Sequence, residues 1–402
     1  MAQGTHTSPY SFLGIGDIND DGLSMNRSLG GLGIGINSSY GLNGLNPAGI
    51  SQMDTMSFTF EFGASGIYKY TQTSTSSEGK FNGNIDYLAI GFPTTKWLKT
   101  SFGMMPYSKV GYNLIENVDV YDGSEYLFTI QRKNSGEGGI NNLFLNNAIT
   151  VYKNFTIGIQ LQYLFGHIQK TLEDTPAETN NSVAEYTEER HLVINDFNYS
   201  FGLQYHQPIK NKTGFTIGGV FGLDNKIKTQ NQIYQKSESS NIEIVLNDNR
   251  TTEEITAPMF YGFGLSVFTE SWLIGADFKT TLWSQSSLSS AEYPLNNSIN
   301  AVIGAEYIPR PRTANNYIQR MRYRLSARYQ NSYISINDKS LTDLGITFGV
   351  GLPMKRSKST INIGIDVGQI GVIDNTVLSQ YYARFRLDIS LHDVWFVKRK
   401  YD

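Results

Sequence analysis

Long segments in which apolar and polar residues alternate are the feature that most restricts what this chain can fold into. Residues 155–165 place Phe, Ile, Ile, Leu, Tyr and Phe at every second position, and residues 321–330 and 381–392 show the same pattern. Successive side chains of a β-strand point to opposite faces of a sheet, so each segment predicts a strand with one apolar face. Segments of about ten or more residues exceed the roughly 5–6 residues of most globular strands and suit a bilayer crossing.

A soluble β-sandwich would show the same alternation, with its apolar faces turned inward. A membrane barrel is favoured because aromatic residues lie near predicted strand ends, as in interfacial girdles. All four tryptophans, Trp97, Trp272, Trp283 and Trp395, are predicted at such rims. The mean hydropathy is −0.30, and no apolar run approaches the ~18–20 residues of a transmembrane helix, which excludes a helical membrane protein.

Counting the alternating segments predicts an all-β fold, a fourteen-stranded antiparallel transmembrane β-barrel over residues 53–392. We expect it in the outer membrane of a Gram-negative bacterium, and the even number of strands would place both termini in the periplasm. The polar stretches 116–139, 173–190 and 230–254 are predicted as the longer outer loops. Residues 393–402 would form a basic periplasmic tail.

The first 52 residues lack this alternation and are rich in small residues. A glycine-rich run at 29–35 is followed by the sequence SSYGLNGLNPAG at 38–49. Glycine lets the backbone approach other groups closely, and proline lacks a backbone donor, so neither a sheet strand nor a packed helix is expected. We predict that residues 1–52 form a plug in the barrel lumen. No signal peptide follows Met1, and we take the sequence as a mature chain.

The third predicted strand, residues 97–112, breaks the pattern because it contains Gly103 and Pro106. Proline cannot donate to a sheet ladder and is confined to edges and bulges. Two interpretations are open. The residues form a bulge near the rim, or the strand is kinked and leaves a gap in the barrel wall.

The glycine-rich run followed by Asn46-Pro47-Ala48-Gly49 resembles the N-terminal signature of the FadL-type family of outer-membrane transporters. The kinked third strand and the count of fourteen strands are similar to that family as well. The resemblance implies that Asn46, Pro47, Ala48 and Gly49 form a hatch. It also implies that hydrophobic substrates, fatty acids or aromatic hydrocarbons, leave sideways near Gly103 and Pro106. The family also includes accessory subunits of secretion and barrel-assembly complexes.

Charged residues on the predicted inner face are a second set of candidates. They are Glu61, Asp277, Lys279, Glu306, Arg322, Arg324, Arg328, Asp366, Arg384, Arg386 and Asp388. Arginine rows opposite carboxylates can select anions or position a plug. A lumen face is polar in any barrel, however, and opposite charges on neighbouring strands stabilise a sheet modestly, so structural filling is the favoured interpretation.

Asp17, Asn19 and Asp21 match the first half of a calcium-binding loop, in which alternate oxygen ligands precede a glycine. The twelfth position of the loop is Ser28, where the full motif needs a bidentate glutamate. A solvated acidic turn is therefore favoured over a metal site.

Two functions are consistent with these residues. The first is passive uptake of hydrophobic small molecules across the outer-membrane lipid, with no cofactor. The second is a structural or accessory subunit that binds other outer-membrane or periplasmic proteins. The five histidines have no metal-ligand or catalytic spacing, so no catalytic residue is expected, and the net charge of −3 gives no support to nucleic-acid binding.

Overall fold

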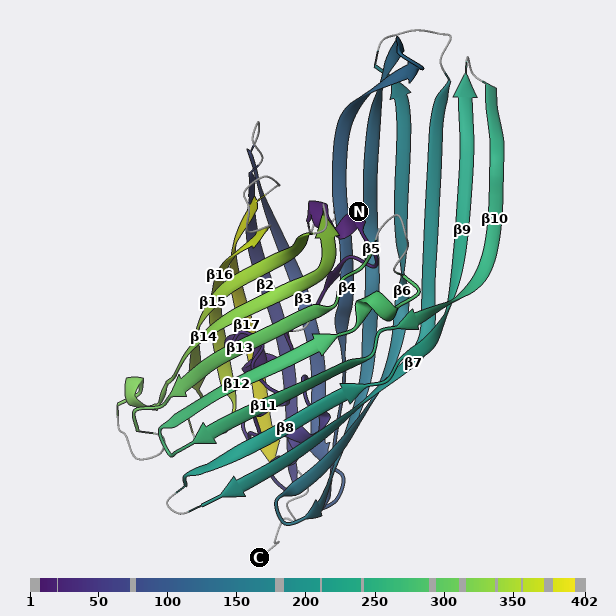
Figure 1. The fold of residues 1–402 in the computed structure, drawn as a ribbon. Coiled ribbons are helices and arrows are strands. Elements are labelled where there is room, and N and C mark those ends of the chain that lie inside the picture. Colours follow the sequence, from purple (N-terminus) through teal and green to yellow (C-terminus); the bar gives the residue numbers. More distant parts are fainter. Residues whose placement is uncertain are drawn as a thin grey trace, which may run out of the picture.

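Antiparallel strands build almost the whole molecule, as the ribbon of the computed structural model shows (Figure 1). The structure describes residues 8–19, 21–72, 77–177, 184–209, 212–239, 242–288, 294–310, 316–336, 339–355, 357–371 and 379–394. The first half of the barrel consists of β2 (Ser57–Gln72), β3 (Ser77–Pro93), β4 (Leu98–Asp122), β5 (Glu125–Tyr152), β6 (Phe155–Pro176), β7 (Glu185–Pro208) and β8 (Gly214–Gly222). The second half consists of β11 (Phe260–Phe268), β12 (Trp272–Thr281), β13 (Ser298–Tyr307), β14 (Arg322–Ile336), β15 (Lys339–Pro353), β16 (Thr360–Gly371) and β17 (Ser379–Val394).

These fourteen strands close into a barrel, because each pairs with its neighbour, β8 pairs with β11, and β17 pairs with β2. The prediction of a closed fourteen-stranded antiparallel barrel is therefore confirmed. The alternation divides the two faces as expected. In β11, Tyr261, Phe263 and Leu265 are exposed on the outside, whereas Ser266 is buried on the inside. An outer belt of large apolar side chains is the surface that lipid requires.

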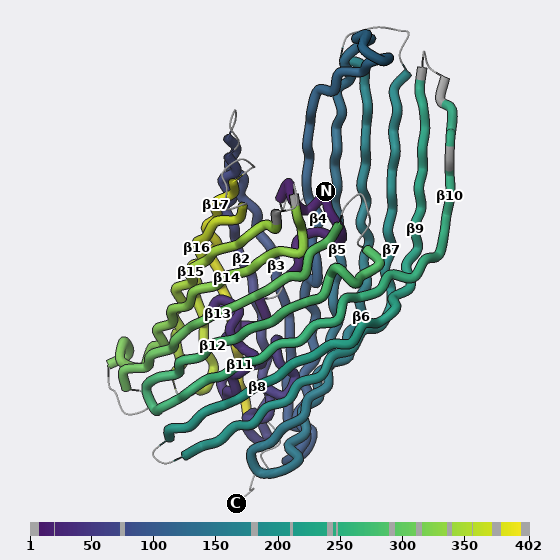
Figure 2. Tube along the Cα trace, viewed as in Figure 1, coloured from purple at the N-terminus to yellow at the C-terminus, as the bar shows by residue number. Residues whose placement is uncertain are grey.

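On one side, the strands continue beyond the barrel as a tall sheet (Figures 1 and 2). We call this the upper sheet; it contains β9 (Asn225–Ser239), β10 (Ile242–Ala257) and the upper residues 113–122 of β4, 125–139 of β5, 166–176 of β6 and 185–196 of β7. Its order is β4-β5-β6-β7-β9-β10, because β9 leaves the line of β8 and pairs with β7 over Glu185 to Ile194.

The upper sheet corrects the prediction of long irregular outer loops. The stretches 116–139, 173–190 and 230–254 are mostly strand, and only 178–183 and 240–241 lie outside the described residues. These strands are mostly polar, and their apolar residues form no continuous stripe in the sequence. Backbone ladders nevertheless pair them across the whole sheet.

The N-terminal segment, of which residues 8–19 and 21–56 are described, lies inside the barrel (Figure 2). Its elements are η1 (Pro9–Phe12), β1 (Asp17–Ile18), α1 (Ser24–Ser28) and η2 (Pro47–Ile50). Leu23, Leu29 and Leu32 are fully buried, so the segment packs as a core rather than as a loose thread. Two short 3-10 helices, η3 (Trp283–Gln285) and η4 (Ile318–Arg320), complete the elements. No described helix is long and apolar enough to span a bilayer.

Two boundaries and one girdle residue differ from expectation. The first barrel strand begins at Ser57, and β17 continues to Val394, while residues 395–402 of the predicted tail lie outside the described residues.

Trp97 and Trp272 are exposed, but Trp283 is only 3% exposed. Its ring stacks on Tyr333, with 4.4 Å between the ring centroids. Trp283 therefore fills the interior rather than the membrane interface, because η3 turns inward after β12.

Candidate functional site

Glycines on the inner wall allow the N-terminal segment to approach the strands closely. An added Cβ at Gly158 of β6 would lie 2.3 Å from the backbone nitrogen of Ala48, and one at Gly264 of β11 would lie 2.2 Å from that of Gly35. Neither distance is compatible with a side chain, so glycine is required at both positions. The predicted hatch residues are thus seated directly on the wall.

Asn46 organises the predicted hatch motif. Its Oδ1 accepts a hydrogen bond from the backbone N–H of Ala48 (3.0 Å), which caps η2. Its Nδ2 donates to the carbonyl oxygens of Ile34 (2.9 Å) and of Leu203 on β7 (3.3 Å). Asn46 is completely buried, and Ala48 and Gly49 are buried in η2 beside it. One side chain therefore joins two parts of the N-terminal segment to the wall.

Replacing Gly158 with alanine should unseat this motif. The new Cβ has no space beside Ala48, and overpacking of this kind costs about 1–3 kcal/mol. We expect a lower melting temperature of the detergent-extracted barrel. Gly83→Ala is the matched control, because an added Cβ at this strand glycine meets nothing within 4 Å. Equal melting temperatures for the two variants would contradict close seating.

Asp277 on β12 holds the glycine-rich run. Its carboxylate accepts three backbone hydrogen bonds, from Gly33 (2.6 Å), Ile34 (2.7 Å) and Gly35 (3.1 Å). Beside it, the Ser266 hydroxyl donates to the carbonyl of Gly35 (2.6 Å). Charge-assisted bonds are about twice as strong as neutral ones, so this anchor is one of the firmest in the lumen.

Asp21 lies at the centre of a cluster of three arginines from two strands, β14 and β17. Its carboxylate is 3.0 Å from Arg384 Nη1, 3.0 Å from Arg386 Nη2 and 3.7 Å from Arg328 Nη1. Burial alone would raise the pKa of Asp21, but these guanidinium groups hold its pKa well below the usual range. Asp366 of β16 forms ion pairs with the same three arginines and accepts a hydrogen bond from Arg386 (3.1 Å). The cluster fixes the segment where β14, β16 and β17 meet.

Two further arginine groups continue this network. Arg27 of α1 pairs with Asp86 on β3 (2.6 Å) and with Asp388 on β17 (3.2 Å). Arg322 and Arg324 share Glu306 at 2.8 and 2.7 Å. Arg324 also donates to Ser28, and the Arg322 guanidinium lies 4.0 Å from the centre of the Tyr40 ring. All of the predicted lumen charges thus lie on the inner face, and most bind the N-terminal segment or one another.

The calcium-like motif does not bring its oxygens together. Asp21 pairs with arginines, whereas Asp17 is 3.7 Å from Lys69. The side chain of Asn19 bonds elsewhere: its Oδ1 accepts from the N–H of Asp21, and its Nδ2 donates to the carbonyl of Pro106 on β4. Within the described residues, no group of three acidic or histidine side chains is arranged for a metal ion.

The barrel wall has a discontinuity between β3 and β4. In the described strands, their pairing covers only the stretch from Pro93 with Lys99 to Leu88 with Met104. Gly103 lies at the end of this ladder. Pro106 follows it at a register shift in the pairing of β4 with β5, just beyond the last β3–β4 pair.

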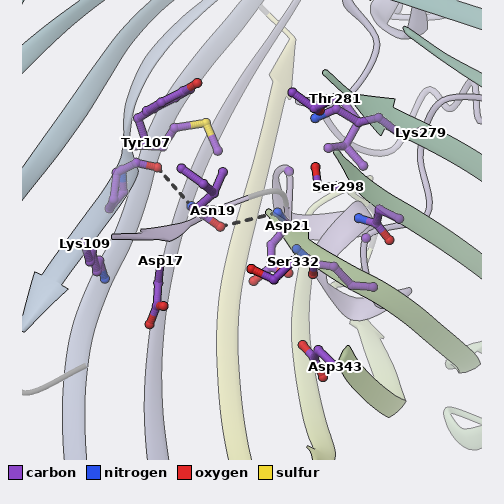
Figure 3. Close-up of a pocket in the computed structure, with 18 of the residues that line it drawn as sticks. Asp17, Asn19, Asp21, Tyr107, Lys109, Lys279, Thr281, Ser298, Ser332 and Asp343 are labelled. Atoms are coloured by element: carbon purple, nitrogen blue, oxygen red, sulfur yellow. Dashed lines mark hydrogen bonds between the residues drawn. The ribbon is translucent and has the colours of Figure 1, made fainter. Parts of the chain in front are cut away.

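Residues 8–19 occupy the side of β4 that β3 leaves unpaired. Asp17 and Ile18 form β1 and pair with Lys109 and Ser108. The N–H of Asn19 donates to the carbonyl of Tyr107 (3.0 Å), as Figure 3 shows. Farther along, the N–H of Ser8 donates to Gly111. We call residues 8–19 the seal. Sequence reasoning missed this role, because two paired residues are too few to show a strand pattern.

A cavity of about 340 Å³ lies next to the seal, in the lumen. It borders both strands of the discontinuity, with Asn82, Asn84 and Asp86 from β3 and Tyr107 and Lys109 from β4. Figure 3 shows side chains that line it from the far wall, namely Lys279, Thr281, Ser298, Ser332 and Asp343. Apolar groups such as Ile18, Val302 and Ile370 complete a mixed surface.

Comparison with solved structures gives the same fold. The crystal structure of the toluene transporter TbuX of Ralstonia pickettii has 14% identity and a TM-score of 0.59, with 93% of this chain and 99% of that chain covered. The Pseudomonas putida toluene transporter TodX has 13% identity and a TM-score of 0.59, with 94% and 100% covered. A Pseudomonas aeruginosa FadL homologue has 10% identity and a TM-score of 0.53, with 96% and 100% covered.

Identities this low establish the fold alone. They confirm the predicted resemblance to FadL-type barrels, since the alignments include nearly every residue of both chains. None of the curated protein sequences matches this chain. The sequence model of the BamG family matches residues 1–402, and the chain therefore belongs to the BamG family.

Proposed function

We propose that this barrel passes small hydrophobic molecules through the outer membrane and releases them sideways between β3 and β4. The observation that carries the proposal is the loss of β3–β4 pairing beyond Leu88 and Met104, beside a cavity that borders both strands. Solved structures of the same fold are named as toluene transporters. Transfer of an apolar solute into lipid is favourable, so no cofactor or catalytic step is required.

In this proposal, the seal is the part that moves. Residues 21–50 are held by Asp277, by the arginine cluster and by Asn46. The seal makes fewer main-chain bonds to β4 than a full strand would, because only Asp17 and Ile18 are in ladder register. Segments with few backbone bonds open at a lower free-energy cost than fully paired strands, and the burial of Tyr10, Leu13 and Ile15 adds to the cost of opening the seal. Displacing the seal would join the cavity to the surrounding lipid.

A disulfide that ties the seal to β4 should abolish uptake. The N–H of Asn19 bonds to Tyr107, so these two residues form a hydrogen-bonded pair, and the adjacent pair, Ile18 with Ser108, is a non-hydrogen-bonded one. The Cα atoms of Ile18 and Ser108 should therefore lie about 4.5 Å apart, a distance that suits a disulfide. We expect Ile18→Cys/Ser108→Cys to block uptake of radiolabelled toluene or fatty acid when oxidised, and to restore it on reduction.

The native chain contains no cysteine, so the double variant forms a single possible disulfide. The two single variants, treated with the same oxidant, are the matched controls and should transport like the native chain. Full uptake by the oxidised double variant, with the disulfide verified by mass spectrometry, would reject the lateral route.

A second candidate function is an accessory subunit of a larger outer-membrane complex. The upper sheet favours it, because its strands are mostly polar and extend beyond the barrel. Gentle extraction from the native membrane, followed by native mass spectrometry, tests this function. A partner protein at fixed stoichiometry supports it, and a chain that is always found alone contradicts it.

A further inference from the structure

The outer edge of β10 is the longest unpaired strand edge of the upper sheet. Within the described residues, β10 pairs only with β9, from Ile242 with Ser239 to Ala257 with Asn225. Among the residues that the structure describes, its base is covered, since Thr256 bonds to Ser286 and Ser287. Figure 1 shows β10 as the outermost ribbon of the upper sheet, with no strand beyond it.

The contacts of Thr256 reveal which backbone groups face this edge. Its N–H donates to Ser287 Oγ (2.8 Å), and its carbonyl accepts from Ser286 Oγ (2.6 Å), so both groups point away from β9. In an antiparallel ladder this orientation recurs at every second residue. The register has no shift between Asn247 and Ala257. The N–H and C=O groups of Glu254, Thr252, Arg250 and Asp248 therefore face outward.

Natural proteins usually protect such an edge with charged residues, especially lysine, with proline, with a bulge or with a very short strand. β10 has sixteen residues and contains neither lysine nor proline; its charges are mainly acidic, and its one register shift lies near the tip, between Val245 and Asn247. Near its tip it exposes the large apolar side chains of Ile244, Val245 and Leu246, each more than half exposed. The edge therefore resembles a template for a further strand rather than a protected end.

Charge indicates which strand would fit. β10 carries four acidic residues and one arginine, for a net charge of −3, and residues 113–122 at the opposite edge of the sheet also carry −3. The upper sheet as a whole has a net charge of −8, although the complete chain has only −3. Pairing of these edges between two copies would place like charges opposite one another, which destabilises a sheet. A basic strand would be attracted instead.

We propose that the free edge of β10 binds an extended, basic segment of another envelope protein by β-sheet addition. The main chain would supply hydrogen bonds at Asp248, Arg250, Thr252 and Glu254, and the acidic side chains would select the partner. This inference rests on the accessory-subunit function and is independent of uptake through the β3–β4 discontinuity.

Thr252→Pro tests the edge directly. It removes an outward N–H, and proline is tolerated on edge strands where the N–H faces solvent, so the β9–β10 ladder should survive. A photo-crosslinking amino acid at exposed Asn249 reports contact in the native membrane. The same probe at Gln131, which pairs with strands on both sides, is the control and should give no product.

We expect crosslinking at Asn249 to a basic segment of another protein, which mass spectrometry of the crosslinked peptide identifies. Thr252→Pro should reduce the product by about tenfold, the factor given by losing one or two main-chain hydrogen bonds. Glu253→Lys/Glu254→Lys, which leaves the backbone unchanged, should reduce it as well. Toluene uptake should be unaffected by each of these changes.

Three results would overturn the proposal. They are a product with a second copy of this chain, no product at Asn249, or a product that neither variant reduces. If a partner still co-purifies at fixed stoichiometry from the Thr252→Pro strain, the accessory function stands and docking at β10 is wrong. If no partner co-purifies with the native chain, the accessory function itself is wrong.

Discussion

Replacing Arg386 with methionine is expected to release the N-terminal segment and to raise the ion conductance of the barrel sharply. Arg386 is completely buried. It donates to Asp21 (3.0 Å), to Asp366 (3.1 Å) and to the carbonyl of Arg27 (2.7 Å). Its removal leaves buried carboxylates with less compensation, which typically costs about 3–5 kcal/mol. Single-channel recording in planar bilayers measures the opening.

Arg190→Met is the matched control for this experiment. Arg190 also pairs with a carboxylate, that of Glu188, but it is well exposed on β7, where such pairs contribute little. We expect native conductance from that variant. Arg386→Lys should be intermediate, because lysine keeps the charge but not the planar fork of donors. A folded Arg386→Met barrel with native conductance and melting temperature would show that the ion cluster does not hold the segment.

Asp277→Ala is expected to have the second largest effect. It leaves the buried N–H groups of Gly33, Ile34 and Gly35 without an acceptor, and each unsatisfied donor costs about 1–3 kcal/mol. The glycine-rich run should detach from β12. Hydrogen exchange of these amides, measured by mass spectrometry, should become much faster than in the native chain.

The graded control is Asp277→Asn, which retains one acceptor oxygen and should give intermediate exchange. Amides remote from the lumen, such as those in the paired centre of β5, should exchange at native rates in both variants. Unchanged protection of residues 33–35 in Asp277→Ala would mean that other contacts hold this part of the segment.

The barrel could be predicted from the sequence because lipid imposes a period of two on every strand. Residues 260–268 show this plainly, since Tyr261, Phe263 and Leu265 face outward and Ser266 faces inward. The inward direction of the charged residues follows from the same alternation. Such a pattern indicates the face of a side chain but not its partner.

The anchoring of the N-terminal segment, the upper sheet and the seal could not be predicted, because they depend on contacts between residues far apart in the sequence. Asp277 meets Gly33, 244 positions away along the chain, only because the barrel closes around the segment. The strands of the upper sheet are mostly polar, so β9 and β10 resemble polar loops in the sequence. Only two residues of the seal pair with β4, and a segment that short shows no alternation of apolar and polar residues in the sequence.

The seam between the last strand and the first one carries several of the contacts to the N-terminal segment. Arg384, Arg386 and Ser390 lie on β17, and Glu61, opposite Ser390 on β2, accepts from the N–H of Leu42 (3.0 Å). A barrel that closed without the segment would bury these groups with fewer partners, because Asp21 and the N–H of Leu42 would be missing. Closure of the cylinder and seating of its contents are therefore coupled in free energy. Contacts made by Asp21 and Leu42 therefore stabilise the junction at which β17 pairs with β2.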